Sequence, residues 1–412
     1  MSIASDRLPL TETLTPADQA EAAALVRQAY EAETPLYPIG GGTALEFGLP
    51  ARLPGLGLSL AGLNRVVDYP ARDMTITVEA GIRMTELIAR LAEAGQRLPV
   101  DAAQAEAATL GGVVATNFSG PRRYGHGTIR DYVIGISAVD GRGTPFKGGG
   151  RVVKNVAGYD FCKLLCGSLG TLAVITQVTL KVKPLPEATA FLSCEVADSA
   201  QAEPLLAALV QSQTTPVAIE LAAGPLWQAE PVSAGNAARL LVGFEGSTAE
   251  VDWQLAELRR EWQTQDAPGV VEHAGKTATS IWSQLTQFAC ASDAGLVVKA
   301  NVLPSATTRF MQLCRELDPQ VSLLAHAGNG IVLASFPEFS PADTSNWLIK
   351  RLQPAAAAAS GNLVVWSRAG GELTRQAVWG VTRDDAEVMR AVKRQFDPRG
   401  LLNPGRFVYG TP

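Results

Sequence analysis

The sequence contains few of the residues that build metal centres. Its 412 residues include five cysteines and three histidines, and no two cysteines are spaced as C-x-x-C. Zinc and iron–sulfur sites need several such ligands at close spacing, so we expect no metal site. The cysteines are odd in number, and we expect reduced thiols that pack as small apolar side chains.

The sequence also lacks the features by which proteins bind nucleic acid, cross a membrane or are secreted. A net charge of −5 gives no overall attraction to nucleic acid or anionic lipid. No apolar stretch is long enough to cross a bilayer, and the N-terminus lacks the basic region and apolar run of a signal peptide. We therefore expect a cytoplasmic protein that binds no nucleic acid and sits at the inner face of a membrane only through partner subunits.

Two standard phosphate-binding motifs are missing, although glycine is concentrated in one loop. The stretch PIGGGTAL, residues 38–45, has neither the Gly-Lys-Ser/Thr of a P-loop nor a spaced G-x-G-x-x-G. Consecutive glycines let backbone N–H groups approach an anion without a Cβ in the way, but they also occur in tight turns. The residues alone leave both interpretations, phosphate cradle and turn, open.

The length of the chain predicts two domains, because 412 residues exceed one typical core. Pro184 and Pro186 follow a clear strand pattern over 171–184 and place a boundary near residue 187. Residues 190–370 alternate helix-like and strand-like stretches, which indicates an α+β domain with an antiparallel sheet. A final helix, capped by Asp384 or Asp385, is expected to run through Phe396.

Hydrophobic periodicity predicts which faces of three elements are buried. The strand over 171–184 has alternating residues, so one face is expected to be buried and the other, with Thr179, to be wet. The helix over 84–95 and the final helix each carry one apolar face. These faces consist of Met84, Leu87, Ile88 and Leu91 in the first helix, and of Val388, Met389, Val392 and Phe396 in the second.

Residues 100–128 are unusually rich in small residues. The segment VDAAQAEAATLGGVVATNFSGPRRYGHGT is too polar for a buried helix and too rich in glycine for a regular strand. A backbone of this kind suits close approach to a ligand, and long irregular segments inside a domain are usually functional. An ordinary surface loop is the alternative, and we favour the functional interpretation.

An ordered set of motifs resembles the FAD-linked oxidases of the vanillyl-alcohol oxidase type. The glycine triplet is followed by VEAG, by TLGGVVATNFSG, by Tyr-Gly near Asp131, by KNVAGYD, by GSLGTLAVIT, and by a terminal FDPRGLLNPGRF. Within that family the sequence looks closest to the FAD-binding E subunit of bacterial glycolate oxidase. The resemblance runs from about residue 34 to the end.

The resemblance implies an α+β fold with a PCMH-type FAD-binding domain of two subdomains over residues 1–188. An α+β cap domain with an antiparallel sheet would span 189–380, and residues 381–412 would return to the FAD domain. The cofactor would be FAD, bound non-covalently, because Thr43 stands where some relatives carry the histidine that attaches the flavin.

The resemblance also implies which residues hold FAD. The expected FAD residues fall into five groups. They are a first diphosphate loop, a second diphosphate cradle, a segment that runs towards the flavin ring, flanking positions, and residues at the adenine end of FAD. In that order they are Pro38, Gly40, Gly41, Gly42, Thr43 and Ala44; Thr109, Gly111, Gly112 and Val113; Thr116, Asn117 and Gly120; Asp101, Tyr124 and Gly125; and Gly170 and Ile175.

The catalytic elements of the hydroxyacid-oxidising relatives are incomplete in this sequence. Leu169 replaces the acid of their G-S-E-G-T-L motif, and HAGNGIV over 326–332 has His326 but no second histidine of their metal-binding H-x-G-x-G-N-x-H. His326 is a candidate base or a structural residue. Arg368 is a candidate carboxylate clamp or a structural arginine. We predict no metal ligand.

The resemblance implies three functions in decreasing order of preference. In the first, the chain is the FAD-binding subunit of a glycolate oxidase complex that yields glyoxylate. Electrons would pass between a second FAD-containing subunit, an iron–sulfur subunit and quinone. In the second, it is a self-sufficient FAD-dependent dehydrogenase for glycolate or D-lactate, with His326 as the base and Arg368 or Arg123 holding the carboxylate. In the third, it is a scaffold subunit without flavin.

Overall fold

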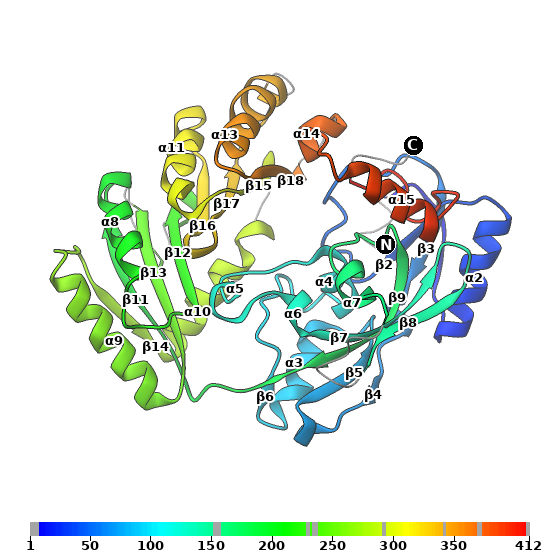
Figure 1. Cartoon of the computed structure of the whole chain (residues 1–412), viewed down its shortest axis with the longest axis horizontal. Coiled ribbons are helices and arrows are strands. Elements are labelled where there is room, and N and C mark those ends of the chain that lie inside the picture. The colour runs from blue at the N-terminus through cyan, green and yellow to red at the C-terminus, as the bar shows by residue number, and fades with distance from the viewer. Residues whose placement is uncertain are drawn as a thin grey trace. The chain divides into compact units, whose positions relative to one another are not determined.

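The computed structural model describes residues 8–150, 158–227, 231–232, 238–290, 294–340, 343–368 and 373–408. The KNVAGYD motif therefore lies largely outside the described residues. The chain divides into two compact units (Figure 1). The first unit comprises residues 1–119, 127–185 and 381–412, and the second comprises 120–126 and 186–380. Each unit has its own sheet and core.

The first unit is built on a five-stranded antiparallel sheet. Its order is β4 (Val66–Asp68), β5 (Thr75–Glu79), β9 (Ala173–Lys181), β7 (Val133–Asp140) and β8 (Pro145–Gly149). A three-stranded parallel sheet has the order β1 (Leu10–Leu14), β3 (Gly55–Ser59) and β2 (Leu36–Ile39). A two-residue pair joins β6 (Gln96–Arg97) to β10 (Lys183–Pro184).

Short helices of the first unit connect these strands. They are α2 (Gln19–Glu31), α3 (Met84–Ala92), α4 (Leu110–Thr116), α6 (Ile129–Tyr132), α7 (Phe161–Leu165) and α15 (Ala386–Phe396). α2 begins at Asp18, whose carboxylate accepts a hydrogen bond from the Glu21 amide at 2.9 Å, as a good N-cap does. None of the described helices is long and apolar enough to span a membrane.

Three predictions about buried faces need correction. Ile88 is 46% exposed, because α3 buries the narrower stripe of Met84, Leu87 and Leu91. Val388 on α15 is also exposed. Thr179 is buried instead of wet, because β9 lies between two strands and the Thr179 hydroxyl pairs with that of Thr77 at 3.0 Å. A central strand can thus bury a polar residue whose hydrogen bond is satisfied.

The C-terminal segment, which contains α15, packs into the first unit (Figure 1) and contains a buried ion pair between Lys393 and Asp397. α15 begins after Asp385, which makes no side-chain capping bond there. Lys393 is 1% exposed and donates to Asp397 and, at 2.6 Å, to the carbonyl oxygen of Thr171. Asp397 in turn accepts from the Leu402 amide at 2.8 Å. This network fixes the chain just before the terminal Asn-Pro-Gly turn.

The second unit is built on an eight-stranded antiparallel sheet, in agreement with the predicted α+β class. The order is β14 (Val271–Ala274), β11 (Ala188–Val196), β13 (Ala238–Gly246), β12 (Ala218–Ala223), β16 (Ser322–His326), β17 (Ile331–Phe336), β15 (Leu296–Asn301) and β18 (Asn362–Arg368). Its helices include α5 (Arg123–His126), α8 (Ser199–Leu209), α9 (Thr248–Gln263), α10 (Gly275–Gln287), α11 (Thr307–Leu317), α13 (Gln353–Ala358) and α14 (Arg375–Trp379).

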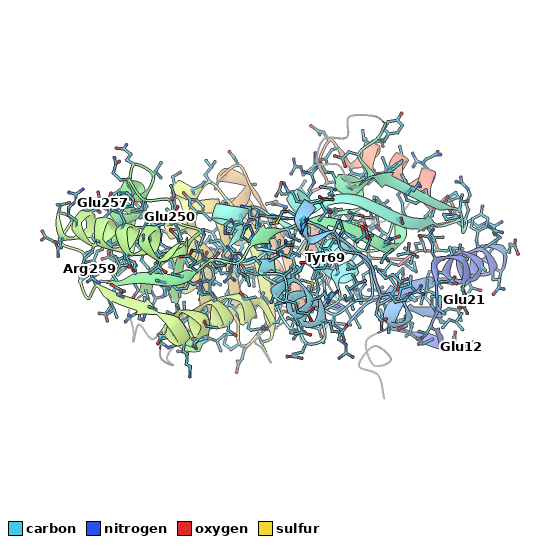
Figure 2. All side chains as sticks on the ribbon, turned by 90° about the horizontal axis from the view of Figure 1, so that it is seen from below. Glu12, Glu21, Tyr69, Glu250, Glu257 and Arg259 are labelled. Atoms are coloured by element: carbon cyan, nitrogen blue, oxygen red, sulfur yellow. The ribbon has the colours of Figure 1, made fainter. Side chains whose placement is uncertain are left out.

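Helix α9 illustrates how local sequence sets an element of this unit. Ser247 and Glu250 form a capping box, in which the Ser247 amide donates to the Glu250 carboxylate at 2.9 Å. Glu250 near the start of the helix is exposed (Figure 2), while Leu255 and Leu258 are buried. The helix therefore begins at Thr248 and covers the sheet with one apolar face.

Candidate functional site

The glycine triplet forms a tight loop directly after β2. A Cβ on Gly40 would overlap the hydroxyl of Thr109, and a Cβ on Gly41 would overlap the carbonyl oxygen of Ala107. Gly42 has a positive φ of 74°. Each glycine is therefore required where it stands, and the loop lies against the segment that leads into α4.

Helix α4 brings a second group of small residues to this loop. Thr109 is its N-cap and accepts from the Gly112 amide at 3.3 Å. A Cβ on Gly111 would come within 2.8 Å of the Ala80 Cβ, so this glycine permits close packing on the strand side. The prediction that this segment is irregular was wrong, because a side-chain cap and backbone packing support a seven-residue helix within it.

Two buried polar atoms near the end of α4 have no hydrogen-bond partner among the residues that the structure describes. They are Asn117 Oδ1 and Ser168 Oγ, and each is inaccessible to solvent. Asn117 is left-handed at φ 51°, and a Cβ on Gly167 would lie 3.5 Å from the Asn117 Cβ. Buried polar groups in native proteins are normally satisfied. The two orphaned oxygens therefore indicate that a polar ligand group belongs here.

The turn after Ser168 meets both the glycine-loop strand and the C-terminal segment. Gly170 has φ 65°, and a Cβ there would lie 3.7 Å from the Pro38 ring and 3.4 Å from Asn403 Nδ2. Asn403 Nδ2 donates to the carbonyl oxygen of Leu169 at 2.6 Å. Leu169 replaces the family's acid. It takes part in this turn through its backbone, which is left-handed with φ 55°.

The first unit contains most of the residues predicted to bind FAD. Ile175 is a buried core residue of β9, and Asp101 is 5% exposed in the segment before α4. Residues of the first unit from this prediction are Pro38, Gly40, Gly41, Gly42, Thr43, Ala44, Asp101, Thr109, Gly111, Gly112, Val113, Thr116, Asn117, Gly170 and Ile175.

Three predicted FAD residues, Gly120, Tyr124 and Gly125, lie instead in the second unit. The Gly125 amide donates to the carbonyl oxygen of Val217 at 3.1 Å. A Cβ on Gly328 would meet the ring of Tyr124, so this aromatic ring lies on the turn after β16. The excursion of residues 120–126 into the second unit was not predicted.

A buried carboxylate ties this excursion to the second unit. Glu245 at the end of β13 accepts from Arg122 Nε at 2.9 Å and contacts His126 Nε2 at 3.2 Å. The Arg122 guanidinium also lies 4.0 Å from the ring centroid of Trp282. The side chain of Glu245 is 1% exposed, so these contacts neutralise a desolvated charge.

His326 belongs to a row of aligned residues that crosses five strands of the second sheet. Glu220 on β12 pairs with His326 on β16, and His326 pairs with Ile331 on β17. Ile331 pairs with Asn301 on β15, which pairs with Asn362 on β18. Directly paired residues share one face of a sheet, so this row lies on one face.

Two hydrogen bonds hold the polar side chains of this row. His326 Nδ1 lies 2.7 Å from Glu220 Oε2, and the two side chains are 3% and 0% exposed. Asn301 Nδ2 donates to Asn362 Oδ1 at 2.7 Å. No group of three or more His, Cys, Asp or Glu side chains that could hold a metal occurs among the described residues.

Lys299 adds a charged amine to the same face. It pairs with Leu333, which pairs with Leu324, two residues before His326, so Lys299 and His326 point to the same side. Burial, with repulsion from Arg123, lowers the pKa of Lys299 to about 8. Arg368 pairs with Leu296, three residues from Lys299, so the register points Arg368 to the other side.

Sequence reasoning missed Glu220 and Lys299, although a signal was present. Each is the single charged residue of its strand, in AIELAA and LVVKAN. Charged residues are rarely buried in a strand without a specific use or partner. The sequence could therefore have marked both positions, but it could not have placed them beside His326.

Two family models match the chain. One, described as an FAD binding domain, matches residues 12–149, and the other, described as FAD linked oxidases, C-terminal domain, matches residues 185–407. The second match covers more than half of the chain. It begins at the start of the second unit and ends in the C-terminal segment of the first.

Relatives agree with these matches. The chain is 25% identical to glycolate oxidase subunit GlcD of Bacillus subtilis over 91% of its length and 84% of the relative's. It is 38% identical to GlcE of Escherichia coli over 42% of its length, a match that spans 49% of that subunit. It is 26% identical to a D-lactate dehydrogenase of Archaeoglobus fulgidus over 95% of its length and 90% of the relative's.

Solved structures show the same fold. p-Cresol methylhydroxylase aligns with a TM-score of 0.72 at 15% identity, over 96% of this chain and 88% of that one. Alkyldihydroxyacetonephosphate synthase aligns with a TM-score of 0.68 at 21% identity, over 95% and 76%. The tight glycine loop, the orphaned oxygens and the family matches agree, and the chain belongs to the FAD-linked oxidases, of the glycolate oxidase and D-lactate dehydrogenase type, with FAD as its cofactor.

Proposed function

We propose that the glycine loop and α4 of the first unit hold FAD non-covalently. Gly40, Gly41 and Gly42 would offer backbone amides to the diphosphate beside the start of α4. The observation that carries this assignment is steric, since a Cβ on Gly40 or Gly41 would overlap Thr109 or Ala107. Thr43 offers no histidine for covalent attachment.

Other residues of the first unit would contact the remaining parts of FAD. Within the described ranges Asn117 Oδ1 and Ser168 Oγ are buried acceptors without partners, which suits the hydroxyl or ring N–H groups of a bound FAD. Gly170 and Pro38 would border the adenine end. The intact steric requirements argue against the flavin-free scaffold, because such glycines cost conformational entropy without a use.

The biological role that we propose is the FAD-binding subunit of a glycolate oxidase complex. It is supported by the 38% identity to GlcE in part of the chain and by the full-length likeness to GlcD. Partners of such a subunit would be a second FAD-containing subunit and an iron–sulfur subunit that passes electrons to quinone. We expect the complex in the cytoplasm or peripheral on the inner face of the membrane.

In this role the flavin of the chain would serve as a relay or second redox site, while the sister subunit oxidises glycolate to glyoxylate. When bound, FAD would supply the acceptor of a hydride, which carries two electrons. The residues of this chain would bind it, exclude water from it and set its potential. The incomplete histidine element around His326 favours this relay role.

A second candidate function is oxidation of a small 2-hydroxyacid by this chain itself. It is favoured by the Glu220–His326 pair and by Lys299 on the same face of the second sheet. Of the two arginines expected to hold the carboxylate, Arg123 is close enough to lower the pKa of Lys299, whereas the register points Arg368 to the other side. The substrate would be glycolate or D-lactate.

One experiment separates the two functions. The purified chain, loaded with FAD, is mixed anaerobically with glycolate or D-lactate while its visible spectrum is recorded. The relay role predicts a flavin spectrum that bleaches only when the sister subunit is present. Bleaching of the isolated chain would establish the second function, and a lack of bleaching in both samples would contradict both.

A further inference from the structure

The C-terminal segment runs beside the strand that leads into the glycine loop. The amide of Leu36, at the start of β2, donates to the carbonyl oxygen of Leu401 at 2.9 Å, and the Asn403 amide donates to the carbonyl oxygen of Leu36 at 2.8 Å. A turn follows, in which the Arg406 amide donates to the carbonyl oxygen of Asn403 at 3.1 Å. Arg406 is therefore held at a fixed place relative to the strand that precedes the glycine triplet.

The Arg406 side chain contacts the chain on the other side of the triplet. Its Nη1 donates to the carbonyl oxygen of Phe47 at 2.9 Å, and its Nη2 donates to the carbonyl oxygen of Leu45. Leu45 lies three residues after Gly42. A guanidinium is planar and rigid, so two of its N–H groups together fix the directions of two carbonyl groups. The contact thus sets the course of the backbone just after the triplet.

The positive charge of Arg406 is buried among neutral partners. The residue is 5% exposed, and burial lowers the pKa of its guanidinium to about 10, although Tyr37 and Glu46 act in the opposite direction. The side chain is therefore charged at neutral pH. Among the described residues no ion pair includes Arg406, and its buried Nε has no hydrogen-bond partner. A buried charge without an opposite charge is costly, and an anion nearby would offset that cost.

We propose that Arg406 is a positioning residue for the cofactor, which sets the course of the loop after the glycine triplet and whose buried charge favours the FAD diphosphate at that loop. The inference rests on the proposed FAD cradle. It adds what the cradle lacks, because neither PIGGGTAL nor the α4 sequence LGGVVAT contains a cationic side chain. Arg406 supplies that charge from 361 residues beyond Leu45 and acts through the backbone of the loop.

Arg399 in the same segment makes the same kind of contact at another place. Its Nη1 donates to the carbonyl oxygen of Tyr30, and its guanidinium lies 4.2 Å from the centroid of the Tyr30 ring. Its side chain is 38% exposed and lies 3.4 Å from the Glu33 carboxylate. Arg399 therefore shares residue type, segment and carbonyl contact with Arg406, but it serves α2 instead of the glycine loop. It is the matched control.

Equilibrium titration of the full-length apoprotein with FAD, followed by flavin fluorescence, tests the proposal without turnover. We expect Arg406→Gln to weaken FAD binding at least roughly tenfold, whereas Arg399→Gln keeps the wild-type affinity. Arg406→Lys keeps the charge and should recover part of the lost affinity. Equal affinities of the wild type and Arg406→Gln would overturn the proposal. Equal affinities of Arg406→Lys and Arg406→Gln would overturn its electrostatic half.

Hydrogen exchange separates a local effect from a general loss of stability. In the Arg406→Gln apoprotein we expect faster exchange in peptides that cover residues 40–48 and wild-type exchange in β9, because only the loop loses its anchor. Exchange that is faster throughout the first unit would show that Arg406 supports the fold as a whole, and it would overturn a specific role in the loop.

The outcomes distinguish this inference from the proposed cradle. If the wild type does not bind FAD, the cradle and the role of Arg406 fail together. If Gly41→Ala weakens FAD binding and Arg406→Gln does not, the cradle stands and the role of Arg406 is wrong. Weaker binding in both variants, with faster exchange confined to residues 40–48 in Arg406→Gln, would support both.

Discussion

The proposed FAD cradle of the first unit and the polar row of the second unit are built in different ways. The cradle consists of backbone and small residues, in which Gly41 is required because a Cβ would overlap Ala107. The row consists of side chains such as Glu220 and His326 that lie 106 residues apart in sequence. A cradle of this kind holds a constant cofactor, whereas a row of side chains can change with the substrate.

The largest effect should come from the buried ion pair that fixes the C-terminal segment beside the cradle. We expect Lys393→Met to lower the free energy of unfolding by about 3–5 kcal/mol, because Asp397 is left charged and buried. Denaturant titration measures the change. Arg394→Met, at an exposed neighbouring position, is the control and should change stability by less than about 0.5 kcal/mol. An equally small effect of Lys393→Met would show that the pair does not support the first unit.

A methyl group in the glycine loop should break the cradle specifically. Gly41→Ala forces the loop away from Ala107, and overpacking of this kind costs about 1–3 kcal/mol. We expect FAD affinity to fall at least about tenfold, measured by equilibrium titration of the apoprotein. Gly150→Ala is matched to it, since nothing lies within 4 Å of its Cβ position. Unchanged FAD affinity in Gly41→Ala would remove the loop from the FAD site.

We expect the buried amine of Lys299 to make the free energy of unfolding depend on pH. Its folded pKa of about 8 lies below the ordinary lysine pKa of 10.5, so below pH 8 both states hold the proton and the buried charge costs up to about 3 kcal/mol. Between about 8 and 10.5 the folded state loses the proton first, and wild-type stability rises with pH relative to Lys299→Met. We expect Lys299→Met to be more stable at pH 7 and this advantage to shrink by pH 10. A constant difference in denaturant titrations at the two pH values would contradict the lowered pKa.

The smallest effect tests the turn at Gly170. Asn403→Ala loses the hydrogen bond to Leu169 and also places alanine at φ 48°, for a cost of about 1–2 kcal/mol. Asn403→Gly keeps the backbone angle and should cost less. Thermal unfolding compares the two variants. If alanine and glycine had equal effects, the left-handed conformation would not matter at this turn.

The glycine loop and the small residues around α4 could be singled out from the sequence because their signal is local. The glycines at 40–42 and the small residues at 109–117 appear in order along the chain. Their steric role does not depend on the order of the strands in the sheets. The helix of α4 was missed, since its support comes from the Thr109 cap and from packing on Ala80. Periodicity also overestimated the buried faces of α3 and α15, where neighbours cover only part of the apolar surface.

The polar row could not be predicted because it depends on strand order. Glu220, His326 and Asn301 come together only when β12, β16, β17 and β15 lie side by side in this register. A shift of one residue would turn each side chain to the other face. The excursion of residues 120–126 is a second long-range event, fixed by Glu245 on a distant strand.

The most direct test of the account is the flavin content of the purified chain. Wild-type protein mixed with FAD and then desalted is predicted to keep an equimolar flavin spectrum, to release the flavin on denaturation, and to lose it in Gly41→Ala. A wild-type chain that stays colourless after FAD is added would contradict the assignment of the cradle. Flavin that remains attached after denaturation would contradict non-covalent binding.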